Sequence, residues 1–430
     1  MPERYVTDQM PESLAAVPWS GDTLRSTVHK IVNDTPVFDI HTHLYPPSFR
    51  SLSLWGIDEL VNYHYLIAEV LRSCDVQAEE FWRLTKREQA DLIWRVLFVE
   101  NTPLSEATRG VAGVLTALGL KCGTSDLKEA RKFFEAQDPM KHVENVMRLA
   151  NVSDIVMTND IFDPAEVAYW DQNLEPHPKF HGVLRMDPLL NNWGQADAMV
   201  ASRGFDVGPE LDAKTITGIR RFLDSWILRM KPLYMAASQP PELRYPEDSP
   251  RIRMLSEVIL PSCREHNLPM SLMIGVHKRV NPSLRDAGDS LGHADMSSLE
   301  RLCRDFPDNR FLASLLSREN QHELCVAARK FANLMPFGCW WFLNNPSIVS
   351  EITMERIELL GASFIPQHSD ARILEQILYK WAHSRRVIAD ALTANYEAVL
   401  RDGWPLTEAG IQRDVERMFQ GNFRKWVGIS

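Results

Sequence analysis

Two histidines at the end of a short apolar segment are the first residues whose spacing suggests chemistry. Residues 37–44 read VFDIHTHL, so His41 and His43 lie two positions apart. Because strand side chains alternate between the two faces, both imidazoles would point the same way and Thr42 the other. Two converging imidazoles form half of a metal site. The alternative is a pair of hydrogen-bonded loop histidines.

An aspartate near the other end of the chain offers a third ligand. Residues 364–372 read FIPQHSDAR, an apolar start that runs into Asp370. Two neutral imidazoles and one carboxylate, with a position left open, are ligands of a catalytic rather than a structural zinc ion. Asp370 also precedes a predicted helix, where an aspartate commonly serves as the N-cap. With the histidine pair present, we predict one divalent ion, expected to be Zn²⁺, on His41, His43 and Asp370.

Two arginines are the candidate anion-binding residues. Arg185 ends a predicted strand, and Arg372 follows Asp370 by two residues. A guanidinium group can hold a carboxylate through two parallel hydrogen bonds. For Arg185 the alternative is an ion pair with Asp187. Two arginines at one site favour binding of a substrate carboxylate or of a developing enediolate.

Two aromatic motifs are harder to interpret from the sequence. The first is Tyr63-His64-Tyr65, and the second is Trp340-Trp341 at the end of a predicted strand. By position alone, packing is the favoured role of both. A tryptophan over an active site would also exclude water.

A repeating order of strands and helices must position these residues. We predict strands at 37–41, 154–158, 180–186, 233–238, 269–275, 310–316, 332–339 and 362–366. Predicted helices separate them at 164–171, 211–231, 251–266, 297–304, 321–330, 346–360 and 373–401. Eight such units indicate an α/β fold, a (β/α)8 TIM-like barrel, whose catalytic residues lie at the C-terminal ends of the strands. A doubly wound sheet is the alternative, but no GxGxxG follows any strand.

A large helical insertion follows the first strand. Residues 45–150 show apolar spacing of three and four almost throughout, over a length that no ordinary loop reaches. We therefore expect three parts: 1–44 with an arm, a helix and the first strand, 45–150 as the insertion, and 151–430 as the remaining barrel with C-terminal helices. Residues before Asp22 are expected to form a loose arm, 23–33 a helix, and 406–427 a last helix.

Composition restricts the partners. A net charge of −10 argues against nucleic acid, although a few arginines can still hold a small anion. Six cysteines without a CxxC pair are expected to be reduced thiols, as in a cytoplasmic protein. No signal-peptide pattern is found, and no apolar run reaches the roughly 18–20 residues of a membrane helix, so we expect no membrane partner.

The chain resembles the uronate isomerases, a family of the amidohydrolase superfamily. The resemblance rests on HTH at 41–43, on WWFLNNP at 340–346 and on DAR at 370–372, and it runs from about Asn33 to Gly428. It implies the barrel fold and isomerisation of D-glucuronate to D-fructuronate and of D-galacturonate to D-tagaturonate. A hexuronate is therefore the expected small-molecule partner, and a homo-oligomer is the expected assembly.

The resemblance also implies roles for individual residues. Metal binding falls to His41, His43 and Asp370; catalysis to Asp370, Tyr65, Arg372 and His64; substrate binding to Arg185, Trp340, Trp341 and Arg372. One departure is Met273, where many uronate isomerases carry a histidine on the fifth strand. Whether His277, four residues on, compensates for it is left open, and His277 is not assigned as a ligand. No lysine occurs in 233–238 to hold a second metal, as the superfamily often does, which favours one ion.

Three functions are compatible with these residues. We favour a uronate isomerase that transfers a proton through an enediol, with Tyr65 as the base once Arg372 or the metal has lowered its pKa. A metal hydrolase or decarboxylase would use the same arginines, but hydrolysis commonly needs a metal-activated water, and this metal site has few ligands. An inactive sugar-acid binding protein is disfavoured because all the proton-transfer residues are present. The preferred C4 epimer is left open.

Overall fold

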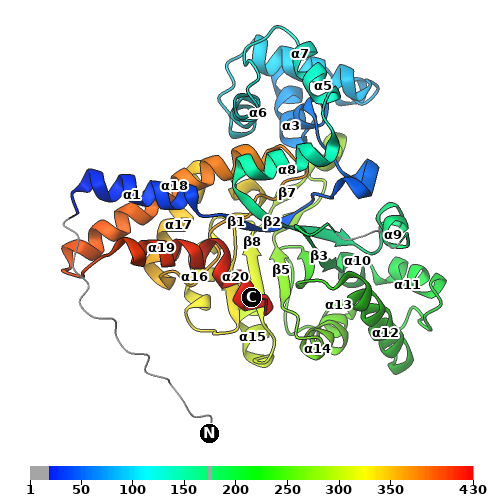
Figure 1. Cartoon of the computed structure of the whole chain (residues 1–430). Helices are drawn as coiled ribbons and strands as arrows, with labels where there is room; N and C mark the ends of the chain where they lie inside the picture. Colours follow the sequence, from blue (N-terminus) through cyan, green and yellow to red (C-terminus); the bar gives the residue numbers. More distant parts are fainter. Residues whose placement is uncertain (1–18, 173–176, 430) are drawn as a thin grey trace.

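The fold is α/β and is built on a parallel sheet. The computed structural model describes residues 19–172 and 177–429, so the arm predicted before Asp22 lies almost wholly outside the described residues. Seven strands pair in the order β1-β2-β3-β4-β5-β8-β9 (Figure 1). They are β1 Val37–Thr42, β2 Val152–Asp160, β3 Phe180–Arg185, β4 Met235–Gln239, β5 Met270–Ile274, β8 Phe311–Leu315 and β9 Leu334–Pro336. Strands β1, β5 and β8 are buried along their whole length, as expected for a parallel sheet with covered faces.

Helices connect the strands as predicted. They are α9 Pro164–Trp170, α12 Ala213–Met230, α13 Pro250–Arg253, α14 Leu260–Glu265, α15 Met296–Asp305, α16 Asn320–Ala328 and α17 Pro346–Leu360. A wide helical turn at Met254–Ile259 joins α13 to α14, which explains why a single helix was predicted over 251–266.

Two local structures in these connections were not predicted. Helices α10 Asp187–Asn191 and α11 Trp193–Ser202 follow β3, and a short antiparallel hairpin, β6 Val276–His277 with β7 Ser290–Leu291, follows β5. Both lie just beyond the carboxyl ends of strands of the parallel sheet, where they border the cavities described below.

The predicted insertion is helical. Between β1 and β2 lie α2 Ile57–Val61, α3 His64–Ser73, α4 Ala78–Phe81, α5 Lys86–Trp94, α6 Glu106–Ala117, α7 Lys128–Glu135 and α8 Pro139–Ala150. Most of them gather at one end of the molecule (Figure 1). Helices α6 and α8 pack against α18 Gln376–Arg401. The boundaries proposed at 44/45 and 150/151 stay a prediction.

The last helix of the chain packs against the start of β1. After α18 come α19 Glu408–Glu416 and α20 Asn422–Val427, joined by a wide turn, so 408–427 is continuous as predicted. Phe423 of α20 packs edge-on against Phe38 at the start of β1. Helix α1 Gly21–Asp34 lies along α18 and α19. None of the helices in the described part of the chain is long and apolar enough to span a bilayer.

The predicted eighth strand, 362–366, is reduced to one parallel bridge between Phe337 and Ile365. Ile365 N donates to Pro336 O at 3.1 Å, and Gly338 N donates to Ile365 O at 2.9 Å. Pro366 has no N–H to continue the pairing. Pairing with β1 resumes later, where Asp370 N donates to His41 O at 3.1 Å and His43 N donates to Ala371 O at 2.8 Å. The pairing therefore falls short of an eight-stranded sheet.

The carboxylate of Asp39 spans the gap between β1 and this last segment. It is fully buried; one oxygen accepts from Ser369 N at 3.0 Å and the other from Trp381 Nε1 at 2.8 Å. A side chain thus replaces missing backbone pairing at the seam between the first and last segments.

Glu166 fixes the end of β2 in a similar way. It is 1% exposed and accepts hydrogen bonds from Asn159 Nδ2 (2.6 Å), Asp160 N (2.8 Å), Tyr45 Oη (2.9 Å) and Trp170 Nε1 (3.2 Å). Burial raises its pKa to about 7, although these hydrogen bonds oppose the shift. The protein therefore holds a proton on Glu166 at pH values where the unfolded chain has lost it.

We predict a pH-dependent contribution of Glu166 to stability. The folded state binds more protons than the unfolded state between pH 4.5 and 7, so stability falls by about 3 kcal/mol as the pH rises through that window. Glu166→Gln should flatten this slope, and the exposed control Glu135→Gln should not. Urea unfolding at several pH values measures the difference; parallel curves for wild type and Glu166→Gln would contradict it.

Candidate active site

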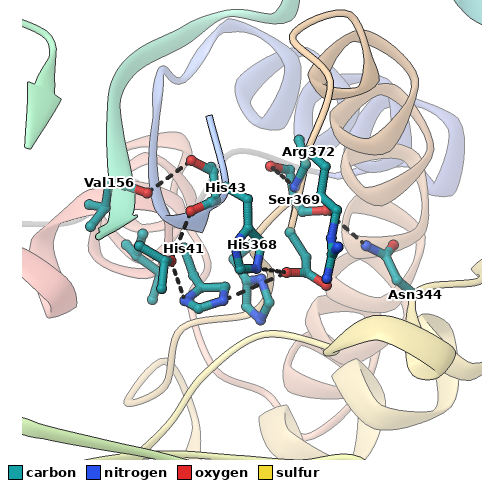
Figure 2. A network of polar contacts seen from close by, with 12 residues as sticks. His41, His43, Val156, Asn344, His368, Ser369 and Arg372 are labelled. Carbon is teal, nitrogen blue, oxygen red and sulfur yellow. Dashed lines mark hydrogen bonds and ion pairs between the residues drawn. The ribbon is translucent and has the colours of Figure 1, made fainter. Parts of the chain in front are cut away.

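The three predicted ligands meet where β1 lies beside residues 368–372. Figure 2 shows His41 and His43 close to His368, Ser369 and Arg372. Asp370 Oδ1 lies 3.6 Å from His41 Nε2 and 3.5 Å from His43 Nε2. The ligand atoms of the three residues all lie within 4.8 Å of one another, and no other such group of His, Cys, Asp or Glu is found among the described residues. Asp370 Oδ1 is buried without a hydrogen-bond partner in this part of the chain. The group can hold a metal ion.

Thr158 sets the tautomer of His41. Its hydroxyl donates to Thr42 O at 2.8 Å, so it can only accept from His41 Nδ1, which lies 3.4 Å away. The ring proton of His41 is therefore on Nδ1, and the Nε2 lone pair faces Asp370. Such a hydrogen bond to the distal ring nitrogen is the usual orienting contact of a histidine ligand.

The charge states also suit a cation. Burial lowers the pKa of both His41 and His43, which keeps the imidazoles neutral and able to ligate. Burial alone would raise the pKa of Asp370, but the neighbouring His43, His41 and His368 hold it below its usual range. A carboxylate and two neutral imidazoles are thus preformed.

Two residues of the site have unusual backbones. Asp370 has a φ of +50° and Trp341 a φ of +47°. Left-handed conformations are rare for residues other than glycine and cluster at functional sites. With this backbone conformation, the Asp370 carboxylate lies beside both histidines.

His368 packs against the ring of His41 and does not line the cavity described below. It is fully buried, its ring lies 5.1 Å from that of His41, and neither ring nitrogen has a hydrogen-bond partner among the described residues. Gly338 packs against it so closely that an added Cβ would lie 1.9 Å from His368 Cδ2. His368 was not predicted as a site residue, because nothing in the sequence distinguishes it from a core histidine.

The ligand group lines a small cavity, here called the inner cavity. Its walls include the predicted residues His41, His43, His64, Arg185, Trp340, Trp341, Asp370 and Arg372. Tyr65 is the predicted site residue that does not line it. The wall also includes Lys278 and Asp289 from the unpredicted hairpin region after β5.

The arginines differ in their partners. Arg185 makes the ion pair that the sequence left open: its Nε lies 2.8 Å from one Asp187 carboxylate oxygen and its Nη2 3.1 Å from the other. For the Arg372 side chain no ion pair is found with any described residue, while its backbone N donates to Gln376 Oε1 at 2.8 Å. Arg372 is thus the more available of the two for an anion.

His64 and Tyr65 begin helix α3 beside the cavity. Burial lowers the pKa of His64 well below its usual value, so the ring is neutral, and Nε2 has no partner among the described residues. Burial raises the pKa of Tyr65 well above its usual value. The nearby ionisable groups raise it further, so the predicted lowering by Arg372 or the metal would have to overcome both effects.

Met273 and His277, the residues discussed above in place of a fifth-strand histidine, differ in position. Met273 lies in the wall of the inner cavity. His277 instead pairs with Glu242, Nε2 to Oε1 2.6 Å, on a half-exposed surface. It therefore does not join the ligand group, in agreement with the sequence analysis.

Comparison with solved structures gives full-length matches. A uronate isomerase from Bacillus halodurans C-125 is 50% identical, with a TM-score of 0.95 over 96% of this chain and 98% of that one. A uronate isomerase from Thermotoga maritima (14% identity, TM-score 0.78, 96% and 100% covered) and a glucuronate isomerase from Caulobacter crescentus (15%, 0.76, 98% and 97%) share the fold. No protein-family model and no curated protein matches the chain.

The contact between Gly338 and His368 yields a prediction. Gly338→Ala should lower the free energy of unfolding by about 1–3 kcal/mol more than Gly361→Ala, because the new methyl group must displace His368. Gly361 is a matched control: it also has a positive φ, +60°, but an added Cβ would meet no atom within 4 Å. Urea unfolding measures both variants, and equal losses would show that His368 moves freely.

Proposed function

This chain belongs to the uronate isomerase family and is an aldose–ketose isomerase of uronates; we propose that D-glucuronate and D-galacturonate are its substrates. The observation that carries the proposal is the meeting of a three-ligand group with Arg185 and Arg372 in one cavity, in a chain 50% identical to a uronate isomerase. The products would be D-fructuronate and D-tagaturonate. Membership of the amidohydrolase superfamily is consistent with this fold.

We propose that one Zn²⁺ ion is the resident cofactor, held by His41, His43 and Asp370. The buried Asp370 oxygen without a partner and the neutral imidazoles fit such an ion. When bound, it would supply Lewis-acid polarisation of a substrate oxygen. Met273 in the cavity wall offers no imidazole for a further ion.

The protein residues would divide the remaining work. Arg372 and Arg185 would hold the carboxylate or the enediolate oxygen through charge-assisted hydrogen bonds. Trp340 and Trp341, both at most 9% exposed, would exclude water from the cavity. Asp370 would exchange a proton during opening of the sugar ring.

Isomerisation moves hydrogen from C2 to C1, and we propose that it moves as a proton. The C2 proton leaves to form an enediol, C1 gains a proton, and the C1 and C2 oxygens exchange carbonyl for hydroxyl character. His64 is neutral and lines the cavity, so it is a candidate to accept or relay a proton. Tyr65 lies beside it at the start of α3, with ring centroids 4.7 Å apart, and is the second candidate for proton transfer. The role of Tyr65 as the base, with its pKa lowered by Arg372 or by the bound metal, stays a prediction.

The finer points of architecture and location are also proposals. Residues 364–371 would act as the eighth strand of a closed (β/α)8 barrel, supported by the Phe337–Ile365 bridge and the pairing of Asp370 and Ala371 with β1. A cytoplasmic location is supported by six free cysteines. The homo-oligomer stays a prediction.

Metal content tests the ligand assignment. The protein should bind one equivalent of zinc per chain, and Asp370→Ala should lose it because a buried ligand is removed. Asp289→Ala is the matched control, since Asp289 lines the same cavity outside the ligand group. Elemental analysis after dialysis measures the content; two equivalents in the wild type, or full retention in Asp370→Ala, would refute the assignment.

Isotope incorporation tests the route. Run in heavy water, the reaction should place deuterium at C1 of the ketose, because an abstracted proton can exchange with solvent. Tyr65→Phe should reduce kcat at least a hundredfold while circular dichroism shows an intact fold. Full transfer of a C2 label to C1, read by NMR, would instead favour a hydride shift, and an active Tyr65→Phe enzyme would remove tyrosine from the mechanism.

A further inference from the structure

The inner cavity adjoins a larger outer cavity, and we propose that the outer cavity binds a second uronosyl unit. The enzyme would then isomerise the reducing end of short 4-linked oligouronides as well as free uronates. This inference rests on the proposed function, because it names a further substrate class of the same site.

The two cavities adjoin each other. Five residues, Arg185, Asp187, Ser238, Val276 and Lys278, line both of them. The inner cavity has a volume of about 70 Å³ and the outer one about 730 Å³. A volume of that size is within the range of small-molecule sites, whereas the narrow inner end admits only part of a sugar.

The outer wall has the chemistry of a sugar-acid site. Helices α10 and α11 contribute the amides Asn191, Asn192 and Gln195, and the loop after β2 contributes Phe162. Asn192 Nδ2 donates to Gln195 Oε1 at 2.6 Å, which leaves the Gln195 amide nitrogen without a described partner. Amides can hydrogen-bond sugar hydroxyls, and an aromatic side chain offers an apolar surface for a sugar ring.

Two cations in this wall suit an additional carboxylate. Lys278 is exposed, and no ion pair with a described residue is found for it. Arg251 uses Nε to donate to Leu190 O at 3.2 Å, and its other nitrogens have no described hydrogen-bond partner. Asp160 and Asp187 also line the cavity, but Asp187 is already paired with Arg185.

The direction of the substrate follows from where its ends must lie. C1 and C2 react beside His41, His43 and Asp370, at the inner end. The carboxylate, at the other end of the six-carbon chain, then lies toward Arg185, which lines both cavities. O4 is two carbons from that carboxylate, so a sugar linked through O4 would extend into the outer cavity. The hydrogen transfer involves only C1, C2 and their oxygens and leaves the glycosidic bond intact.

The test compares galacturonate with its α-1,4-linked dimer on the metal-loaded enzyme. We expect ketose formation from the dimer with a kcat/KM within tenfold of that for the monomer. Gln195→Trp, which fills the outer cavity, should lower kcat/KM for the dimer at least tenfold and leave the monomer within twofold. Ala198→Trp is the control, because Ala198 is exposed on the same helix but does not line the cavity.

Each other outcome overturns the inference in a distinct way. If only the monomer is isomerised, the subsite is wrong and the uronate isomerase stands. If Gln195→Trp slows monomer and dimer equally, the outer cavity is an entrance and not a subsite. If neither substrate is converted, the proposed function fails and the subsite with it.

Discussion

The structure depends on the seam where the first strand meets the last extended segment. Backbone pairing there is incomplete, because Pro366 cannot donate and the pairing resumes only at Asp370. Asp39 compensates by accepting from Ser369 N and from the Trp381 indole, both from inside the core. The ligands lie next to these contacts: His41 is two residues after Asp39, and Asp370 directly follows Ser369. Asp370 has a left-handed backbone conformation at this seam, and its carboxylate lies beside both histidines.

Burial prepares the ligands and the proton-transfer residues at once. Desolvation disfavours charged forms, so it keeps His41, His43 and His64 neutral and Tyr65 protonated. An imidazole must be neutral to bind a metal ion or to accept a proton, and a phenol must be protonated to donate one. One dry environment therefore keeps the imidazoles neutral, whereas Asp370 stays ionised because the neighbouring histidines outweigh the effect of its burial.

Much of the arrangement could be predicted from the sequence because it follows from local pattern. Apolar runs alternating with helical spacing gave the seven paired strands and their connecting helices. The HxH pair and Asp370 could be assigned to one metal site, because the first and last units of the predicted barrel would be neighbours. The eighth strand could not be judged, because a single bridge and an extended segment have the same apolar pattern as a strand. His368 was missed for a related reason: its place beside His41, with ring centroids 5.1 Å apart, comes from tertiary contact and not from local pattern. The pKa of Tyr65 depends on burial, which no spacing records.

The charges around the inner cavity explain how an acidic protein can take an anionic sugar. Arg185, Arg372 and Lys278 contribute three positive charges to its wall, and Asp187, Asp289 and Asp370 three negative ones. With the imidazoles neutral, the wall by itself is close to electrically balanced. A bound divalent cation would make the net charge of the wall positive. The added charge would lie near Asp370, at the end where C1 and C2 react. The cations toward the outer cavity would then bind carboxylate while the inner end favours the charge that develops on the enediolate oxygen. Binding of the carboxylate and stabilisation of the enediolate can thus be adjusted separately, at the two ends of one narrow site.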